Sequence, residues 1–163
     1  MDFNHSFTVT SIDLPGQITD KQLGNAFGCS GQNYSPQLTW KNAPKSTKAF
    51  AITMYDQDAP TGSGFWHWVV YNIPNSENSI EANSGTTSEN KLPAGAEHGT
   101  NDAGIRGYVG PCPQPNTLHT YLITVYALKS PIVVDDSACA AWIGFMLNAN
   151  VITKASLVAY GQG

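Results

Sequence analysis

The sequence contains little charge. Asp, Glu, Lys and Arg make up 12% of its 163 residues, against about 25% in an ordinary soluble protein. The net charge is -4, and no run of Lys or Arg occurs, so the basic surface of a duplex-binding protein is missing. We therefore expect no nucleic-acid partner.

Long apolar runs are also absent. The first residues, MDFNHSFTVTSID, have neither the basic start nor the apolar core of a signal peptide. No later segment approaches the roughly twenty apolar residues that span a bilayer. These absences predict a protein without a transmembrane segment, and cytoplasmic residence is the simplest expectation.

Cysteine is scarce, and its spacing is uninformative. Cys29, Cys112 and Cys139 are far apart and include no C-x-x-C pair. Their odd number and wide spacing argue against both a disulfide framework and a thiolate zinc site. We expect reduced, small, buried side chains.

Glycine and proline, in contrast, are plentiful. The 15 Gly and 10 Pro residues are spread along the chain and separate short apolar runs, a texture typical of an all-β protein with long loops. The length suits a single domain over residues 1–163. Strands are predicted at 6–12, 37–41, 48–56, 65–73 and 119–128, with a short final strand at KASLVAY, residues 154–160.

Two regions depart from the strand pattern. Residues 74–118 are rich in Asn, Ser, Gly, Thr and Pro, which indicates a long loop region with little regular structure, and long ordered loops often wall a site. Apolar residues from 136 to 150 recur at helical spacing, which predicts a helix with Asp135 or Asp136 as its N-cap.

Polar residues occur at the ends of three predicted strands. Because side chains alternate between the faces of a strand, three sets share a face: Phe50, Ile52, Met54, Asp56 and Asp58; Phe65, His67, Val69 and Tyr71; His119, Tyr121, Ile123 and Val125. If the strands are neighbours, the polar members converge at one edge of the sheet: Asp56, Asp58, His67, His119 and Tyr121.

Such a cluster suits a small anionic ligand. Imidazolium and tyrosine hydroxyl groups donate hydrogen bonds to phosphate oxygens, and the carboxylates orient the imidazoles or hold a cationic part of the same ligand. The alternative is a metal-assisted hydrolase in which Asp56, Asp58, His67 and His119 bind a divalent ion.

Simpler interpretations remain open for each element. The DQDAP segment can be a strand end and a turn, and His67 can be a core histidine bonded to a carbonyl group. Trp66, Trp68 and Tyr71 are more often packing residues than ligand platforms. The YVGPCPQPN segment, residues 108–116, can be a rigid loop.

Four segments together resemble one known family. They are GQNYSPQLTW (31–40), YDQDAPTGSGFWHWVVYNIP (55–74), NDAGIRGYVGPCP (101–113) and His119 with Tyr121, followed by YAL. In this order they resemble signatures of the phosphatidylethanolamine-binding proteins, in the bacterial Raf-kinase-inhibitor-like branch. Gln57, Gln114 and Asn116 depart from the usual family residues at the rim of its pocket.

The resemblance implies a fold and a function. The fold would be mostly β, with a large antiparallel sheet packed on a smaller sheet and one short C-terminal helix. The function would be non-enzymatic binding of phosphate, phosphoryl head groups such as phosphoethanolamine, or other small anions, without a metal or cofactor. The implied ligand-binding residues are Asp56, Asp58, Pro60, His67, Gly110, Pro111, His119 and Tyr121.

Partners follow from the same resemblance. It implies regulation of a protein partner such as a kinase or a protease, and a homodimer like that of bacterial relatives. The absence of a G-x-S-x-G, H-E-x-x-H or G-x-x-x-x-G-K-[ST] motif from the sequence agrees with a protein that is not an enzyme.

Overall fold

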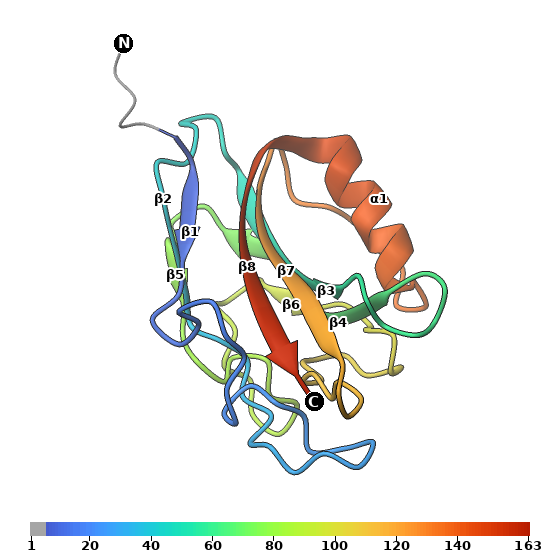
Figure 1. Ribbon diagram of the computed structural model, residues 1–163. Helices are drawn as coiled ribbons and strands as arrows, with labels where there is room; N and C mark the ends of the chain where they lie inside the picture. The colour runs from blue at the N-terminus through green and yellow to red at the C-terminus, as the bar shows by residue number, and fades with distance from the viewer. Residues whose placement is uncertain (1–5) are drawn as a thin grey trace.

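Two antiparallel β-sheets and one α-helix form the fold over residues 6–163, the part of the chain that the computed structural model describes (Figure 1). The small sheet has the order β1 (Thr8–Thr10), β2 (Leu38–Lys41) and β5 (Ser79–Ile80). The large sheet has the order β6 (Glu97–His98), β4 (Phe65–Pro74), β3 (Ala49–Asp56), β7 (Leu118–Leu128) and β8 (Val151–Gln162). The helix α1 spans Ala140–Asn150.

The large sheet is buried on both faces over much of its area. One face packs against the small sheet through apolar residues of alternate parity, which include Phe50, Ile52, Met54, Trp68, Ile123 and Val125. The other face packs against α1, mainly through Ala49, Ala51, Val69, Tyr71, Tyr126 and Leu128. The central strands are therefore nearly continuous apolar runs, as expected for strands covered on both sides.

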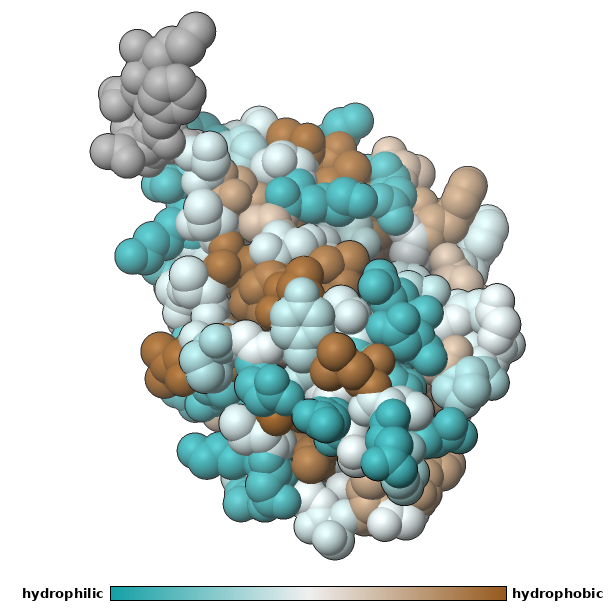
Figure 2. Space-filling model, viewed as in Figure 1, coloured by the Kyte–Doolittle hydropathy of each residue, from teal (hydrophilic) through white to brown (hydrophobic). Residues whose placement is uncertain are grey.

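Helix α1 covers only part of its face of the sheet. Leu122 and Val158 are cross-strand partners in β7 and β8, and their side chains are 37% and 41% exposed. Figure 2 shows hydrophobic side chains on the surface around these two strands.

The predicted mostly-β fold with two sheets and a short helix is confirmed. All six predicted strands are present, and β8 is longer than predicted because it begins directly after α1. Within the predicted loop region, only the two-residue strands β5 and β6 form.

The helix begins later than predicted. The side chain of Asp135 accepts a hydrogen bond from the backbone N–H of Ser137 at 2.8 Å, which closes a separate turn. The N-cap of α1 is Cys139, and its side chain makes no capping hydrogen bond. In residues 6–163, no helix has the length and apolar character needed to cross a membrane.

A β-bulge changes the facing of residues in β4. Tyr55 pairs with Trp66, whereas the adjacent Met54 pairs with Trp68, so His67 is an extra residue in the ladder. The prediction that His67 shares a face with Val69 and Tyr71 was therefore wrong, because those two residues pack toward α1. Phe65 and His67 lie on the other face, beside Asp56.

The cysteine prediction was also wrong. Cys29 and Cys112 form a disulfide across a sequence separation of 83 residues, and both are only partly buried. Cys139 is a free thiol, but it is exposed. The pairing depends on two loops that the fold brings together, which linear spacing does not reveal.

Candidate functional site

A pocket of about 290 Å³ opens where β3, β4 and β7 meet the loop of residues 109–114. Its polar residues include Asp56, His67 and His119. Its apolar wall is formed by Phe27, Ala59, Pro60, Phe65, Val109 and the Cys112 half of the disulfide, and Gly110, Thr61 and Gln114 complete the lining.

Of the five polar residues predicted to converge, Asp56, His67 and His119 line the pocket together. The Nδ1 atom of His119 lies 2.7 Å from Oδ2 of Asp56, and Nε2 of His67 lies 4.0 Å from the same oxygen. We call these three residues the histidine cluster. All three are buried, with exposed fractions of 3% for Asp56 and 6% for each histidine.

The carboxylate of Asp56 has internal partners on both oxygens. Oδ1 accepts a hydrogen bond from the backbone N–H of Asp58 at 2.9 Å, and Oδ2 faces His119. These contacts offset much of the cost of burying the carboxylate. They also set the tautomer of His119, because Nδ1 must carry the proton to donate to a carboxylate.

His67 is fixed in the same manner on its other side. Its Nδ1 atom lies 2.7 Å from the carbonyl oxygen of Val109, which requires the proton on Nδ1. Burial lowers the pKa of His67 from its ordinary value of 6.5, and the hydrogen bond to Val109 and the charge of Asp56 only partly oppose that shift. His67 therefore donates a hydrogen bond to a backbone carbonyl group, as a core histidine would, and it also lines the pocket.

Tyr121 lies beneath the histidine cluster and is 0% exposed. Its ring centroid is 5.6 Å from that of His67 and 6.3 Å from that of His119. Its hydroxyl group is buried without a hydrogen-bond partner in residues 6–163, and burial followed by the charges of Asp56 and Asp58 raises its pKa. Tyr121 thus packs against both imidazole rings inside the protein and does not line the pocket.

The other predicted site residues have different positions. Asp58 is exposed, and its Oδ2 accepts a hydrogen bond from the backbone N–H of Thr120 at 2.7 Å. Pro60 and Gly110 line the pocket. Pro111 lies behind the wall, where its carbonyl oxygen accepts a hydrogen bond from the N–H of Gly24 at 2.8 Å.

Gly110 allows two loops to approach closely. A Cβ atom at this position would lie 2.3 Å from the carbonyl oxygen of Gln22 and 2.6 Å from the nitrogen of Gly24. The N–H of Gly110 also donates to Oδ1 of Asn33 at 2.7 Å. The residue at 110 is therefore restricted to glycine by the backbone of the segment that carries Phe27.

Several pocket residues were not predicted. Phe27 and Val109 come from segments that sequence patterns do not connect with β3 or β7. Phe65 pairs directly with Asp56, so correct strand pairing would have found it. No sequence signal points to Phe27, which reaches the pocket through the disulfide and the loop contacts.

The alternative metal site is not assembled. Among residues 6–163, no group of three or more His, Cys, Asp and Glu side chains is arranged to hold a metal ion. Asp58 turns its carboxylate to Thr120, and both histidines use Nδ1 inside the protein. The four residues proposed as metal ligands therefore do not share one coordination centre.

The whole fold and the pocket segments match one protein family. The family model for phosphatidylethanolamine-binding protein matches residues 8–162. The chain belongs to this family.

Two bacterial proteins of the family are similar to this chain over most of their length. The protein YbcL of Escherichia coli is 45% identical over 156 residues, which cover 93% of this chain and 85% of YbcL. The protein YbhB of the same organism is 38% identical over 144 residues, with 88% and 90% covered.

Solved structures agree. The crystal structure of YbcL, described as a new member of the mammalian family, superposes with a TM-score of 0.93 and 43% identity, covering 96% of this chain and 98% of that chain. A putative phosphatidylethanolamine-binding protein homologue from Chlamydia trachomatis has a TM-score of 0.80 at 23% identity, covering 98% and 99%, and so has the same fold. The predicted family and fold are confirmed.

The departure from the family pattern at Gln57 lies outside the pocket lining. Gln57 is exposed, and its backbone N–H faces the carbonyl oxygen of Thr120 at 3.4 Å. A proline lacks this donor, so glutamine adds a contact between the end of β3 and β7. Gln114, in contrast, does line the pocket.

Proposed function

We propose that this protein binds phosphate, a phosphoryl head group or another small anion in the pocket beside the histidine cluster, without catalysing a reaction. Its family membership supports a binding protein. The observation that carries the proposal is the arrangement of His67 and His119 around one buried carboxylate. Each imidazole uses Nδ1 within the protein, which leaves Nε2 for a ligand oxygen.

The charge of the cluster depends on protonation. With both imidazoles neutral, Asp56 gives the cluster a negative charge that repels an anion. With both protonated, two positive charges outweigh one negative charge, and both Nε2 atoms become donors. Anion binding is therefore coupled to proton uptake.

The sign of the pH dependence of phosphate affinity follows from the protonation of His67. The pKa of His67 lies below its ordinary 6.5 in the free protein, so its protonated fraction grows as pH falls through 6.5 and below. Phosphate affinity is expected to rise over the same interval. If phosphate affinity instead rises steadily with pH, the imidazoles are not the hydrogen-bond donors.

Nuclear magnetic resonance titration tests the proposal. Phosphate and phosphoethanolamine are expected to shift the amide resonances of residues 56–68 and 108–121. Replacing both His67 and His119 with alanine is expected to abolish these shifts. The matched control is His98→Ala, because His98 is an imidazole of β6 that does not line the pocket. Shifts confined to another surface would show that the site is elsewhere.

A further inference from the structure

The apolar wall of the pocket contains one largely exposed aromatic side chain. Phe27 is 75% exposed, and it lines the same pocket as the histidine cluster. A single exposed phenylalanine is ordinary on a protein surface. Here the exposed ring stands at the mouth of a pocket, where a ligand can cover it.

The backbone at Phe27 is also unusual. Its φ angle is 57°, in the left-handed region that bulky side chains rarely occupy and that costs conformational energy. Such a conformation persists only when the surrounding contacts impose it. The segment that carries Phe27 must therefore be held from outside.

Three contacts fasten that segment to the pocket wall. Cys29, two residues after Phe27, is bonded to Cys112. The N–H of Gly24 donates to the carbonyl oxygen of Pro111 at 2.8 Å, and the N–H of Gly110 donates to the side chain of Asn33 at 2.7 Å. Residues 24–33 are thus tied to residues 110–112 on both sides of Phe27.

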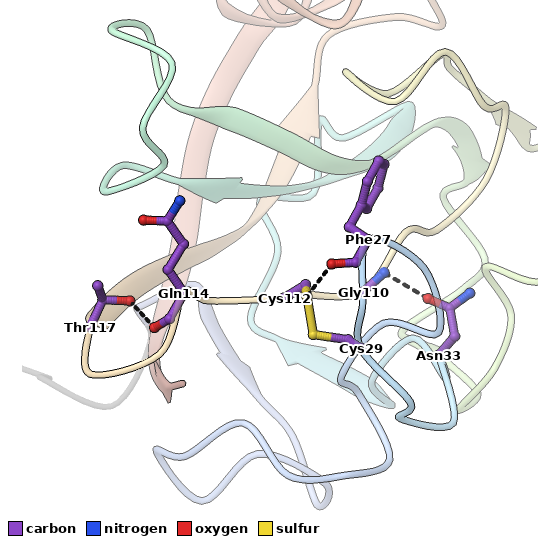
Figure 3. Close-up of a disulfide and its surroundings, with 7 residues drawn as sticks. All are labelled: Phe27, Cys29, Asn33, Gly110, Cys112, Gln114 and Thr117. Atoms are coloured by element: carbon purple, nitrogen blue, oxygen red, sulfur yellow. Dashed lines mark hydrogen bonds between the residues drawn. A yellow bond between two sulfur atoms is a disulfide. The ribbon is translucent and has the colours of Figure 1, made fainter.

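The three contacts also determine where the side chains of this segment lie. In Figure 3, the ring of Phe27 and the side chain of Gln114 stand on the same side of the segment 110–114, where both line the pocket. The Sγ atom of Cys112 lies 3.5 Å from the carbonyl oxygen of Phe27. A disulfide sulfur carries no hydrogen, so this is a packing contact that fixes the backbone of Phe27.

We propose that Phe27 is a specificity-determining residue that contacts an apolar arm of a phosphomonoester, and that the Cys29–Cys112 disulfide holds it in that position. The inference rests on the proposed function, because the phosphoryl group of the ligand lies at the histidine cluster. It adds that the rest of the ligand, beyond the phosphoryl group, is apolar.

The size and lining of the pocket favour such an arm. Pockets for small organic ligands begin at about 300 Å³, so a volume of about 290 Å³ suits a small organic ester better than an inorganic ion. Within residues 6–163, Asp56 is the only acidic residue in the lining, and both of its oxygens already have partners. The wall around Phe27 therefore offers contact to carbon atoms and no free carboxylate for an ammonium group.

Calorimetric titration with three probes tests the inference: inorganic phosphate, phosphoethanolamine and phenyl phosphate. Phenyl phosphate is expected to bind the oxidised protein about tenfold more tightly than inorganic phosphate, because its ring packs against Phe27. Phe27→Ala is expected to reduce the affinity for phenyl phosphate about tenfold more than the affinity for inorganic phosphate. The matched control is Phe145→Ala, which removes an exposed ring of α1 that lies outside the pocket.

A second set of variants tests the disulfide. The double substitution Cys29→Ser with Cys112→Ser is expected to remove most of the preference for phenyl phosphate over inorganic phosphate. Cys139→Ser is the control, because Cys139 is a free thiol outside the pocket. If the double variant does not fold, chemical reduction of the native protein in the same titration replaces it.

The outcomes separate this inference from the proposed function. If inorganic phosphate binds but phenyl phosphate binds no more tightly, only the inference is wrong. It is equally wrong if Phe27→Ala weakens both probes to the same extent, if phosphoethanolamine binds most tightly, or if breaking the disulfide leaves the preference intact. If none of the probes binds, both the proposed function and the inference fail.

Discussion

The two faces of the large sheet use the same strands for different purposes. On one face, α1 covers apolar side chains from β3, β4 and β7, with Ile143 1% exposed and Leu147 0% exposed. At the end of the other face, these strands bury a carboxylate and two imidazoles around a pocket. We call these regions the helix face and the pocket end.

The difference lies in what compensates for burial. On the helix face, most of the stabilisation comes from apolar contact, which needs no polar partners. At the pocket end, Asp56 and His67 need hydrogen bonds inside the protein, and the loops around them are tied by a disulfide. Changes at the helix face should therefore affect stability, whereas changes at the pocket end should affect binding and pH dependence as well.

Loss of the disulfide is expected to have the largest effect on stability. The double substitution Cys29→Ser with Cys112→Ser opens a bond that joins residues 83 positions apart, and chain entropy predicts a loss of about 4.5 kcal/mol in unfolding free energy. Urea unfolding measures it, with Cys139→Ser at the N-cap of α1 as the control. A loss no larger than that of the control would mean that the pocket end is stable without its covalent tie.

Truncation of the helix face comes next. Ile143→Ala is expected to lower the unfolding free energy by about 3 kcal/mol, because it leaves a cavity between α1 and the sheet, and to leave phosphate affinity unchanged. Phe145→Ala, whose ring is 60% exposed on the same helix, is expected to cost about 0.5 kcal/mol. Phosphate affinity that falls together with stability would show that the two regions are coupled.

Replacing each of two tyrosines of β7 with phenylalanine is expected to change stability in opposite directions in the two regions. The hydroxyl of Tyr126, on the helix face, has the polar side chains of Thr53 and Asn148 as neighbours, so Tyr126→Phe is expected to cost about 1 kcal/mol. The hydroxyl of Tyr121 has no partner in residues 6–163, so Tyr121→Phe is expected to be neutral or stabilising by up to about 1 kcal/mol. Thermal unfolding of both variants gives the comparison, and an equal loss in both would contradict it.

Acidification is expected to give a smaller and graded effect. Burial lowers the pKa of His98 to about 4 and also lowers the pKa of His67 from 6.5. The unfolded chain therefore takes up protons first, and the stability present above pH 6.5 decreases as pH falls toward 4. The melting temperature should fall over this interval, and His98→Asn should reduce the slope.

Phosphate distinguishes the two histidines in that experiment. Under the proposed function, phosphate binding strengthens as His67 becomes protonated, so added phosphate should oppose the acid destabilisation in the wild-type protein. The same offset is expected in His98→Asn, which retains the pocket. An offset that disappears in His98→Asn would place the phosphate-linked proton outside the histidine cluster.

Much of the fold was predictable because it depends on local periodicity. The strands predicted at 48–56 and 119–128, which form β3 (Ala49–Asp56) and β7 (Leu118–Leu128), were recognisable from β-branched and aromatic residues, and alternation correctly placed Asp56, His119 and Tyr121 on one face. The start of α1 was less predictable, because Asp135 is a good capping residue but caps the turn that precedes the helix.

The rest of the site depended on contacts between distant segments. Cys29 and Cys112 are paired because two loops meet, and no local pattern encodes that meeting. Phe27 joins the pocket for the same reason. Alternation placed Asp58 beside Asp56 in the cluster, whereas Asp58 lies beyond the end of β3, outside the pocket lining, and its carboxylate accepts a hydrogen bond from Thr120.

The bulge at His67 makes this one position of the sheet replaceable for protein engineering. As an extra residue in the ladder of β4 with β3, His67 can be exchanged without altering the strand pairing on either side. Removing it altogether would restore strict alternation in β4, with Trp66 still opposite Tyr55 and Phe65 still opposite Asp56. The pocket could then be redesigned through a single insertion point while the core of the sheet keeps its register.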